Sequence, residues 1–145
     1  MKNKKSRPIS VYILIVLILF QGLSGLAGGI GLVIDPTGES MQIPITWLEN
    51  SPFSDYFIPG VILLIVLGCF PLIVFYGLLR KTRYSLFASF SIAVALIIWI
   101  IVEILIIGYQ AQPPLQLIYG TVGILLLIVT LLPSVRKYYK DHKEK

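Results

Sequence analysis

Four long apolar runs constrain this chain more than any other feature of its sequence. They cover about 9–34, 57–79, 84–108 and 114–135, and each exceeds the ~20 residues that a helix needs to cross a bilayer core. With a hydrophobic fraction of 57%, a chain of this size could not cover itself with polar surface in water. The sequence therefore predicts one all-α membrane domain, a four-helix transmembrane bundle with an ordered outer loop at 35–56.

Positive charge is confined to three short blocks between and beside the apolar runs. All 12 Lys and Arg lie in "MKNKKSR" at the start, "RKTR" at 80–83 and "RKYYKDHKEK" at 136–145, whereas four acids lie in the loop 35–56. This is the positive-inside pattern of multi-pass membrane proteins. It predicts a prokaryotic plasma-membrane protein with both termini in the cytoplasm and a cytoplasmic tail at 136–145. The net charge of +5 then reflects orientation in a lipid bilayer, and no nucleic-acid partner is expected.

The first apolar run has a second interpretation. A basic start, an apolar stretch and the small residues "GLSGLAGG" are also features of a secretory signal peptide. The run continues to Ile34, which is longer than a signal core needs, so a retained membrane helix is favoured. Cleavage stays open as the alternative.

One carboxylate, Glu103, lies inside an otherwise apolar run, "WIIVEILIIGYQ". It is five residues from Gly108, about 7.5 Å deep at the helical rise. If the third and fourth runs form a hairpin, Glu103 is level with Tyr119, and Gln116 lies one turn away. Without a neighbouring base the carboxyl is expected to be readily protonated. Two interpretations stay open: a proton or ligand site, and a structural hydrogen bond.

A second deep polar residue, Gln21, lies near the middle of the first run, on a face rich in small residues. Small residues at this spacing let helix backbones approach closely. Packing within the monomer is the simpler expectation, and a homo-oligomer seam or a ligand cavity are the alternatives. The predicted packing glycines are Gly25, Gly28, Gly29, Gly120 and Gly123.

Pro71 is the one proline in the middle of an apolar run. It cannot donate a hydrogen bond to the carbonyl of Leu67, so a kink is expected there, with Gly68 allowing a neighbouring backbone to come close. The adjacent Cys69 is expected to be a small packing residue. Because the chain has one cysteine and one histidine, a disulfide, a CxxC pair and a multi-ligand metal site are excluded within one chain, and no cofactor is predicted.

The outer loop carries turn residues at Asp35-Pro36-Thr37-Gly38 and further prolines. These residues predict a compact cap on the bundle. Trp47 and Phe53 are then expected to be sheltered by the bundle or by the lipid interface.

The segment "GGIGLVIDPTGESMQIPITWLENSPFSDYFIPGVILL", together with "WIIVE" and "LQLIYG", resembles a group of small four-helix integral membrane proteins from prokaryotes. The shared pattern is GGxGLxxDPTG…SPFxDYFxPG. The resemblance implies a four-helix bundle with a structured loop, and it brings no catalytic residue with it. The helix count alone is also similar to that of the DoxX-like bundles.

Two function classes follow from these observations. The first is a binding or accessory membrane protein that holds a lipid-like ligand or a partner helix, using Gln21, Glu103, Gln116 and Tyr119. The alternative is a small proton-coupled transporter or carrier in which Glu103 titrates. A carrier needs a polar path to both faces, and the scattered polar residues favour the first class. An enzyme ranks third, because no nucleophile–base pair or metal set is present.

Overall fold

The computed structural model describes residues 6–141, and every regular element in that part of the chain is helical. The second apolar run is one helix interrupted by a π-helical turn, η3. Two short 3₁₀ turns, η1 and η2, lie in the outer loop. The prediction of an all-α fold is confirmed. The elements are α1 (Ile9–Ile34), η1 (Glu39–Met41), η2 (Ile45–Leu48), α2 (Phe57–Leu64), η3 (Ile65–Cys69), α3 (Phe70–Leu79), α4 (Ser85–Ile107), α5 (Leu115–Leu131) and α6 (Pro133–Lys140).

Helix length and hydropathy make this a multi-pass membrane protein. In the described part of the chain, α1, the helix Phe57–Leu79 and α4 are each long and apolar enough to cross a membrane. The fourth candidate span consists of α5 and α6 taken together, and these two helices meet at a bend of 56°. The structure therefore has three to four candidate membrane spans, which contact the lipid bilayer.

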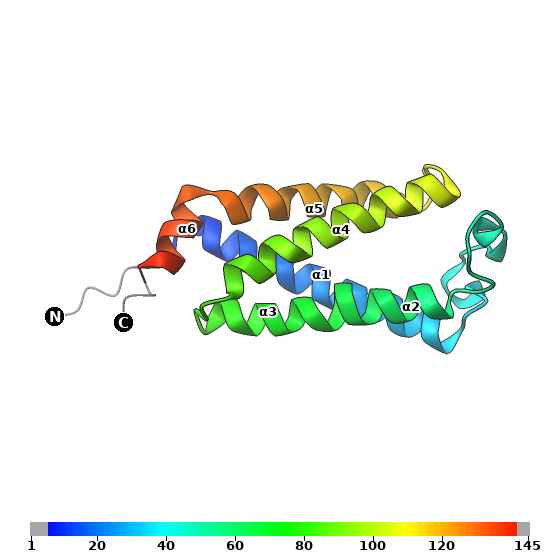
Figure 1. The fold of residues 1–145 in the computed structure, drawn as a ribbon, viewed down its shortest axis with the longest axis horizontal. Helices are drawn as coiled ribbons and strands as arrows, with labels where there is room; N and C mark the ends of the chain where they lie inside the picture. Colours follow the sequence, from blue (N-terminus) through cyan, green and yellow to red (C-terminus); the bar gives the residue numbers. More distant parts are fainter. Residues whose placement is uncertain (1–5, 142–145) are drawn as a thin grey trace.

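The helices form two pairs (Figure 1). α1 packs along α2, η3 and α3, while α4 packs along α5. Contacts of α1 with α5 and of α3 with α4 join the two pairs. The pairs lie together near α6 and the turn 80–84, and they diverge toward the end that carries the outer loop (Figure 1). We call the end with α6 and the turn 80–84 the basic end, and the other the loop end.

The core fills the bundle between the basic end and its middle. Leu14, Ile18, Leu96 and Leu126 are each at most 1% exposed and belong to one apolar cluster. Close packing of this kind makes most of that half of the bundle apolar.

Glycines allow α1 to cross the Phe57–Leu79 helix at backbone contact. A Cβ on Gly25 would overlap the carbonyl of Leu67, and a Cβ on Gly29 would lie 2.6 Å from Cα of Leu64. A Cβ on Gly68 would lie 2.8 Å from the backbone nitrogen of Leu26. The close approach expected at Gly68 is therefore present, and this glycine seam lies within the monomer.

A π-helical turn, η3, ends two residues before Pro71, and the kink expected at this proline stays a prediction. In a regular α-helix the amide of residue 71 would donate to the carbonyl of Leu67, and proline has no N–H. The side chain of Gln21 supplies a donor instead, since its Nε2 lies 3.2 Å from that carbonyl oxygen. The expectation that Cys69 is a packing residue is wrong, because its side chain is exposed.

The fourth apolar run ends earlier than the predicted 114–135. α5 ends at Leu131, and Leu132 takes an extended conformation with ψ 135° before Pro133 begins α6. Steric conflict with the proline ring disfavours the helical conformation in the preceding residue, which explains the break. The predicted tail 136–145 is also helical as far as Lys140, and residues 142–145 lie outside the described part.

Helix α6 lies against the basic end of the bundle. Its Tyr139 hydroxyl donates to the carbonyl of Leu78 at 3.0 Å, and Ser134 shares a hydrogen bond of 2.7 Å with Ser10 at the start of α1. The opposite face of α6 carries Arg136 and Lys140 in exposed positions. α6 is thus an amphipathic helix whose buried face fixes it to the bundle.

Candidate ligand-binding site

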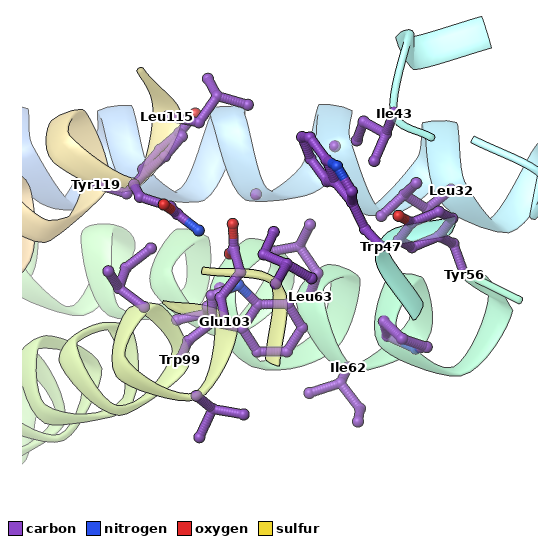
Figure 2. Close-up of a pocket in the computed structure, with 18 of the residues that line it drawn as sticks. Leu32, Ile43, Trp47, Tyr56, Ile62, Leu63, Trp99, Glu103, Leu115 and Tyr119 are labelled. Carbon is purple, nitrogen blue, oxygen red and sulfur yellow. The ribbon is translucent and has the colours of Figure 1, made fainter. Parts of the chain in front are cut away.

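A cavity of about 510 Å³ lies between the two helix pairs where they diverge. Figure 2 shows the Glu103 carboxyl pointing into this space, with Tyr119 on one side and Trp47 on the other. The outer loop closes the loop end of the cavity through Trp47, Leu48 and Phe53. We call this space the apolar cavity, because carbon atoms form most of its wall.

The apolar cavity brings together the four site residues that the sequence predicted. Gln21 comes from α1, Glu103 from α4, and both Gln116 and Tyr119 from α5. Sequence reasoning missed Tyr56 as a wall residue, because it precedes α2 by one position and reaches the cavity only through the fold of the loop. The predicted packing glycines fall into two groups. Gly25 and Gly28 line the cavity and also face the Phe57–Leu79 helix. Gly120 and Gly123 lie between α5 and α4, where Ile100 and Ile97 are their nearest neighbours.

Glu103 is half-buried in the cavity wall. The side chains of Gln116 and Trp99 lie near its carboxyl. The ring of Tyr119, the other predicted partner, stacks on Phe20 with centroids 6.1 Å apart. The structure therefore places Gln116 and Trp99 beside the carboxyl, with Tyr119 in the same cavity.

Gln116 also holds the turn between α4 and α5. Its Oε1 accepts from the backbone N–H of Gln110 at 2.8 Å, and its Nε2 donates to the carbonyl of Gly108 at 3.1 Å. Gly108 has φ 73°, a left-handed conformation that glycine adopts without strain. The 3% exposed Gln116 thus fixes the α4–α5 turn and, through it, the position of Glu103.

Gln21, a residue of the cavity wall, has one buried amide oxygen without a partner. The side chain is 1% exposed, and its Nε2 donates to Leu67. A carbonyl can only accept, so the amide nitrogen must face Leu67 and the orientation of the side chain is fixed. The other amide atom, Oε1, is buried without a hydrogen-bond partner. An unpaired buried acceptor is unfavourable, so a donor that reaches Oε1 would be stabilised there.

The first turn of the outer loop is tied to the end of α1. The Asp35 carboxylate accepts from the Thr37 hydroxyl and amide and, at 2.8 Å, from the Ser40 amide. The Thr37 hydroxyl, and then the Ser40 amide, lower the pKa of Asp35 from 3.8 to about 2. The ionised form of Asp35 is therefore the one that holds this turn.

The second anchor of the loop is Tyr56. Its hydroxyl donates to the carbonyl of Pro44 at 2.8 Å, and its amide donates to the carbonyl of Pro36 at 2.9 Å. Burial raises the pKa of Tyr56 to about 12, and the negative charge of Glu103 contributes to the rise. Tyr56 thus remains a neutral donor that holds the loop over the apolar cavity.

The apolar cavity has a single charged side chain. Among the described residues that line it, Glu103 is the only Asp, Glu, Lys or Arg. No group of three or more His, Cys, Asp or Glu in residues 6–141 is placed to hold a metal ion. The polar groups of the site are therefore one carboxyl and the neutral amide, hydroxyl and indole groups of its wall.

Comparisons of the chain with protein-family models, with curated proteins and with solved structures found no match. The fold and the cavity consequently define the class, a small multi-pass helical membrane protein. The resemblance to small four-helix prokaryotic proteins stays a prediction from the sequence.

Proposed function

We propose that this protein binds an amphiphilic small molecule in the apolar cavity. The observation that carries the proposal is the unpartnered acceptor of Gln21 in the wall of a 510 Å³ cavity. Small-molecule sites have volumes of about 300–1,000 Å³, with mostly apolar walls and a few placed polar groups. The apolar part of the ligand lies among the aliphatic and aromatic side chains. Its head group donates a hydrogen bond to Gln21, to Glu103 or to both.

The charged side chains in the cavity wall limit the chemical class of the ligand's head group. No lysine or arginine lines the wall in the described chain, so a phosphate or carboxylate would be buried there without a counter-charge. A hydroxyl, amide or amine can donate to the available acceptors. The ligand class is therefore a lipid-like molecule with a neutral or cationic donor as its head.

A partner helix fits this cavity less well. A helix about 10 Å across with a pitch of 5.4 Å occupies roughly 420 Å³ per turn. The cavity thus has room for about one turn, and the outer loop covers its end. A small molecule of about this volume would fill the cavity, whereas a helix would extend beyond it.

The proton-coupled carrier is also less well supported. A carrier needs a polar path from Glu103 to the basic end. Leu14, Ile18, Leu96 and Leu126 fill that half of the bundle. A cavity without such a polar path favours a binding or accessory protein of the membrane.

The orientation in the membrane is part of the proposal. The basic end gathers charged residues from three separate segments, which supports a cytoplasmic position for both termini. The apolar cavity and the outer loop then lie toward the outer surface of a prokaryotic plasma membrane.

The proposal is testable by intrinsic fluorescence. The chain has 2 tryptophans, Trp47 and Trp99, and both line the cavity. Titration of the detergent-purified protein with 1-dodecanol should give a saturable change in tryptophan emission. The methyl ether of dodecanol, which cannot donate, should bind about tenfold more weakly, which corresponds to one lost hydrogen bond of about 1.4 kcal/mol.

Two matched variants separate the cavity from the lipid-facing surface. Ala27→Phe places a ring in the cavity wall and should abolish the saturable change. Leu23→Phe adds a ring one turn earlier on α1, on a residue that is 53% exposed, and should leave the change intact. Linear, non-saturable responses in the unmodified protein, or equal responses of both variants, would show that the cavity is not a binding site.

A further inference from the structure

A second cavity, of about 270 Å³, lies at the basic end and is separate from the apolar cavity. Residues of α4 and the turn before it, of α5 and of α6 form it. We call this space the basic pocket.

Positive charge dominates the basic pocket. Arg83, Arg136 and Lys140 line it, and no acidic side chain of the described chain does. Arg136 and Lys140 are four residues apart on α6, so they lie on one face, where like charges repel each other. Arg83 reaches the same space from the turn before α4. An anion between the three side chains would relieve this repulsion.

One residue in the wall of the same pocket has a buried hydroxyl without a partner. Thr130 is 3% exposed, and its Oγ1 has no hydrogen-bond partner in the described structure. In helices a threonine hydroxyl commonly bonds the carbonyl four residues earlier, as Thr121 does with Leu117 at 2.7 Å. The hydroxyl of Thr130 is therefore a donor without an acceptor, in a residue of the pocket wall.

Apolar side chains flank the basic pocket on the side of the membrane helices. Phe87 is 73% exposed, Leu131 is 48% exposed, and Phe90 is 37% exposed. These residues lie on α4 and α5, so their exposed surface belongs to the part of the bundle that meets lipid tails. Cationic and apolar surfaces thus adjoin at one site.

We propose that the basic pocket binds the head group of an anionic phospholipid. The phosphate lies between Arg83, Arg136 and Lys140 and accepts a hydrogen bond from Thr130. The acyl chains follow the surface formed by Phe87, Phe90 and Leu131. Basic pockets between membrane helices on the cytoplasmic side are suited to such head groups. This inference is independent of the ligand of the apolar cavity.

The test measures which lipid the protein retains. The full chain is reconstituted in nanodiscs of equal parts phosphatidylglycerol and phosphatidylcholine, released, and examined by native mass spectrometry. The unmodified protein should retain phosphatidylglycerol over phosphatidylcholine by at least about tenfold. Arg136→Gln and Lys140→Gln combined should bring the ratio close to one, and Thr130→Val should lower it while keeping the shape of the side chain.

Lys137→Gln is the matched control, because it removes the same charge from α6 at a position that does not line the pocket. It should leave the ratio unchanged. An equal loss in Lys137→Gln and Arg136→Gln would mean diffuse attraction to the helix and would overturn the site. Complete displacement of phosphatidylglycerol by millimolar inorganic phosphate would show a site for free phosphate and would overturn the lipid assignment. Persistence of the lipid under phosphate supports it.

Discussion

The glycine seam between α1 and the Phe57–Leu79 helix gives the sharpest prediction about stability. Gly25→Ala adds one methyl group where a new Cβ would come closer to a neighbouring backbone than at any other described glycine. The Cβ would overlap the carbonyl of Leu67 and lie 2.9 Å from the backbone nitrogen of Gly68. Backbone atoms cannot turn away as a side chain can, so the two helices must separate.

The control is Gly120→Ala on α5. There the new Cβ would meet only the side chain of Ile100, at 3.7 Å, which is an ordinary contact. Both substitutions bring the same gain of roughly 0.5–1 kcal/mol from replacing a helical glycine with alanine. The difference between the two variants in the free energy of unfolding therefore measures the cost of the clash alone. Overpacking typically costs about 1–3 kcal/mol, and we expect the upper end because backbone is involved.

Thermal unfolding of the two purified proteins in the same detergent measures this difference. For a chain of this length, about 3 kcal/mol corresponds to a midpoint roughly 10 °C lower for Gly25→Ala than for Gly120→Ala. Equal midpoints, or a higher midpoint for Gly25→Ala, would show that α1 does not cross its neighbour at Gly25, and the seam would be wrong.

Three further predictions concern orientation, the loop and the buried acid. A fluorescent protein fused to the C-terminus should report the cytoplasm, and alkaline phosphatase fused there should be inactive. The loop at 37–55 should resist proteolysis at neutral pH. Because the pKa of Asp35 is lowered to about 2, its stabilising contribution is present above 3.8 and is lost as the pH falls through about 2. Pepsin should thus cut the loop faster toward pH 2, and Asp35→Asn should remove that pH dependence. Glu103→Gln should keep the thermal midpoint, whereas Glu103→Leu removes the acceptor beside Gln116 and should cost about 1–3 kcal/mol; equal midpoints for the two variants would contradict this role.

The sequence was sufficient to predict the helical architecture of the protein. Apolar run length and the positions of charge are local properties of the chain, and they are enough to place helices that must satisfy their own backbone hydrogen bonds in lipid. The limits of α1 and the loop 35–56 agree with the structure within a residue. The early end of α5 could have been read from Pro133, because the residue before a proline seldom stays helical.

Site residues were predictable only in part. Gln21, Glu103 and Gln116 stand out because polar side chains are rare in these apolar runs. A rare polar residue can be recognised in the sequence without knowledge of the fold. Hairpin counting named Tyr119 and Gln116 as partners of Glu103, and the structure places Gln116, together with Trp99, near the carboxyl. Counting gives the depth of a residue, whereas the partner also depends on the rotation of each helix about its own axis.

The sequence by itself determined an all-helical multi-pass chain with its basic residues at one end, because hydropathy and charge act along the chain. The tertiary structure alone decided that the helix pairs diverge and leave the apolar cavity. It also decided that Gln21 meets the carbonyl that Pro71 cannot bond. Only the fold of α6 brings Arg136 to Arg83 at the basic pocket. The physical reason is common to these three results: each depends on where helices cross, and crossing points are set by close packing between segments far apart in sequence.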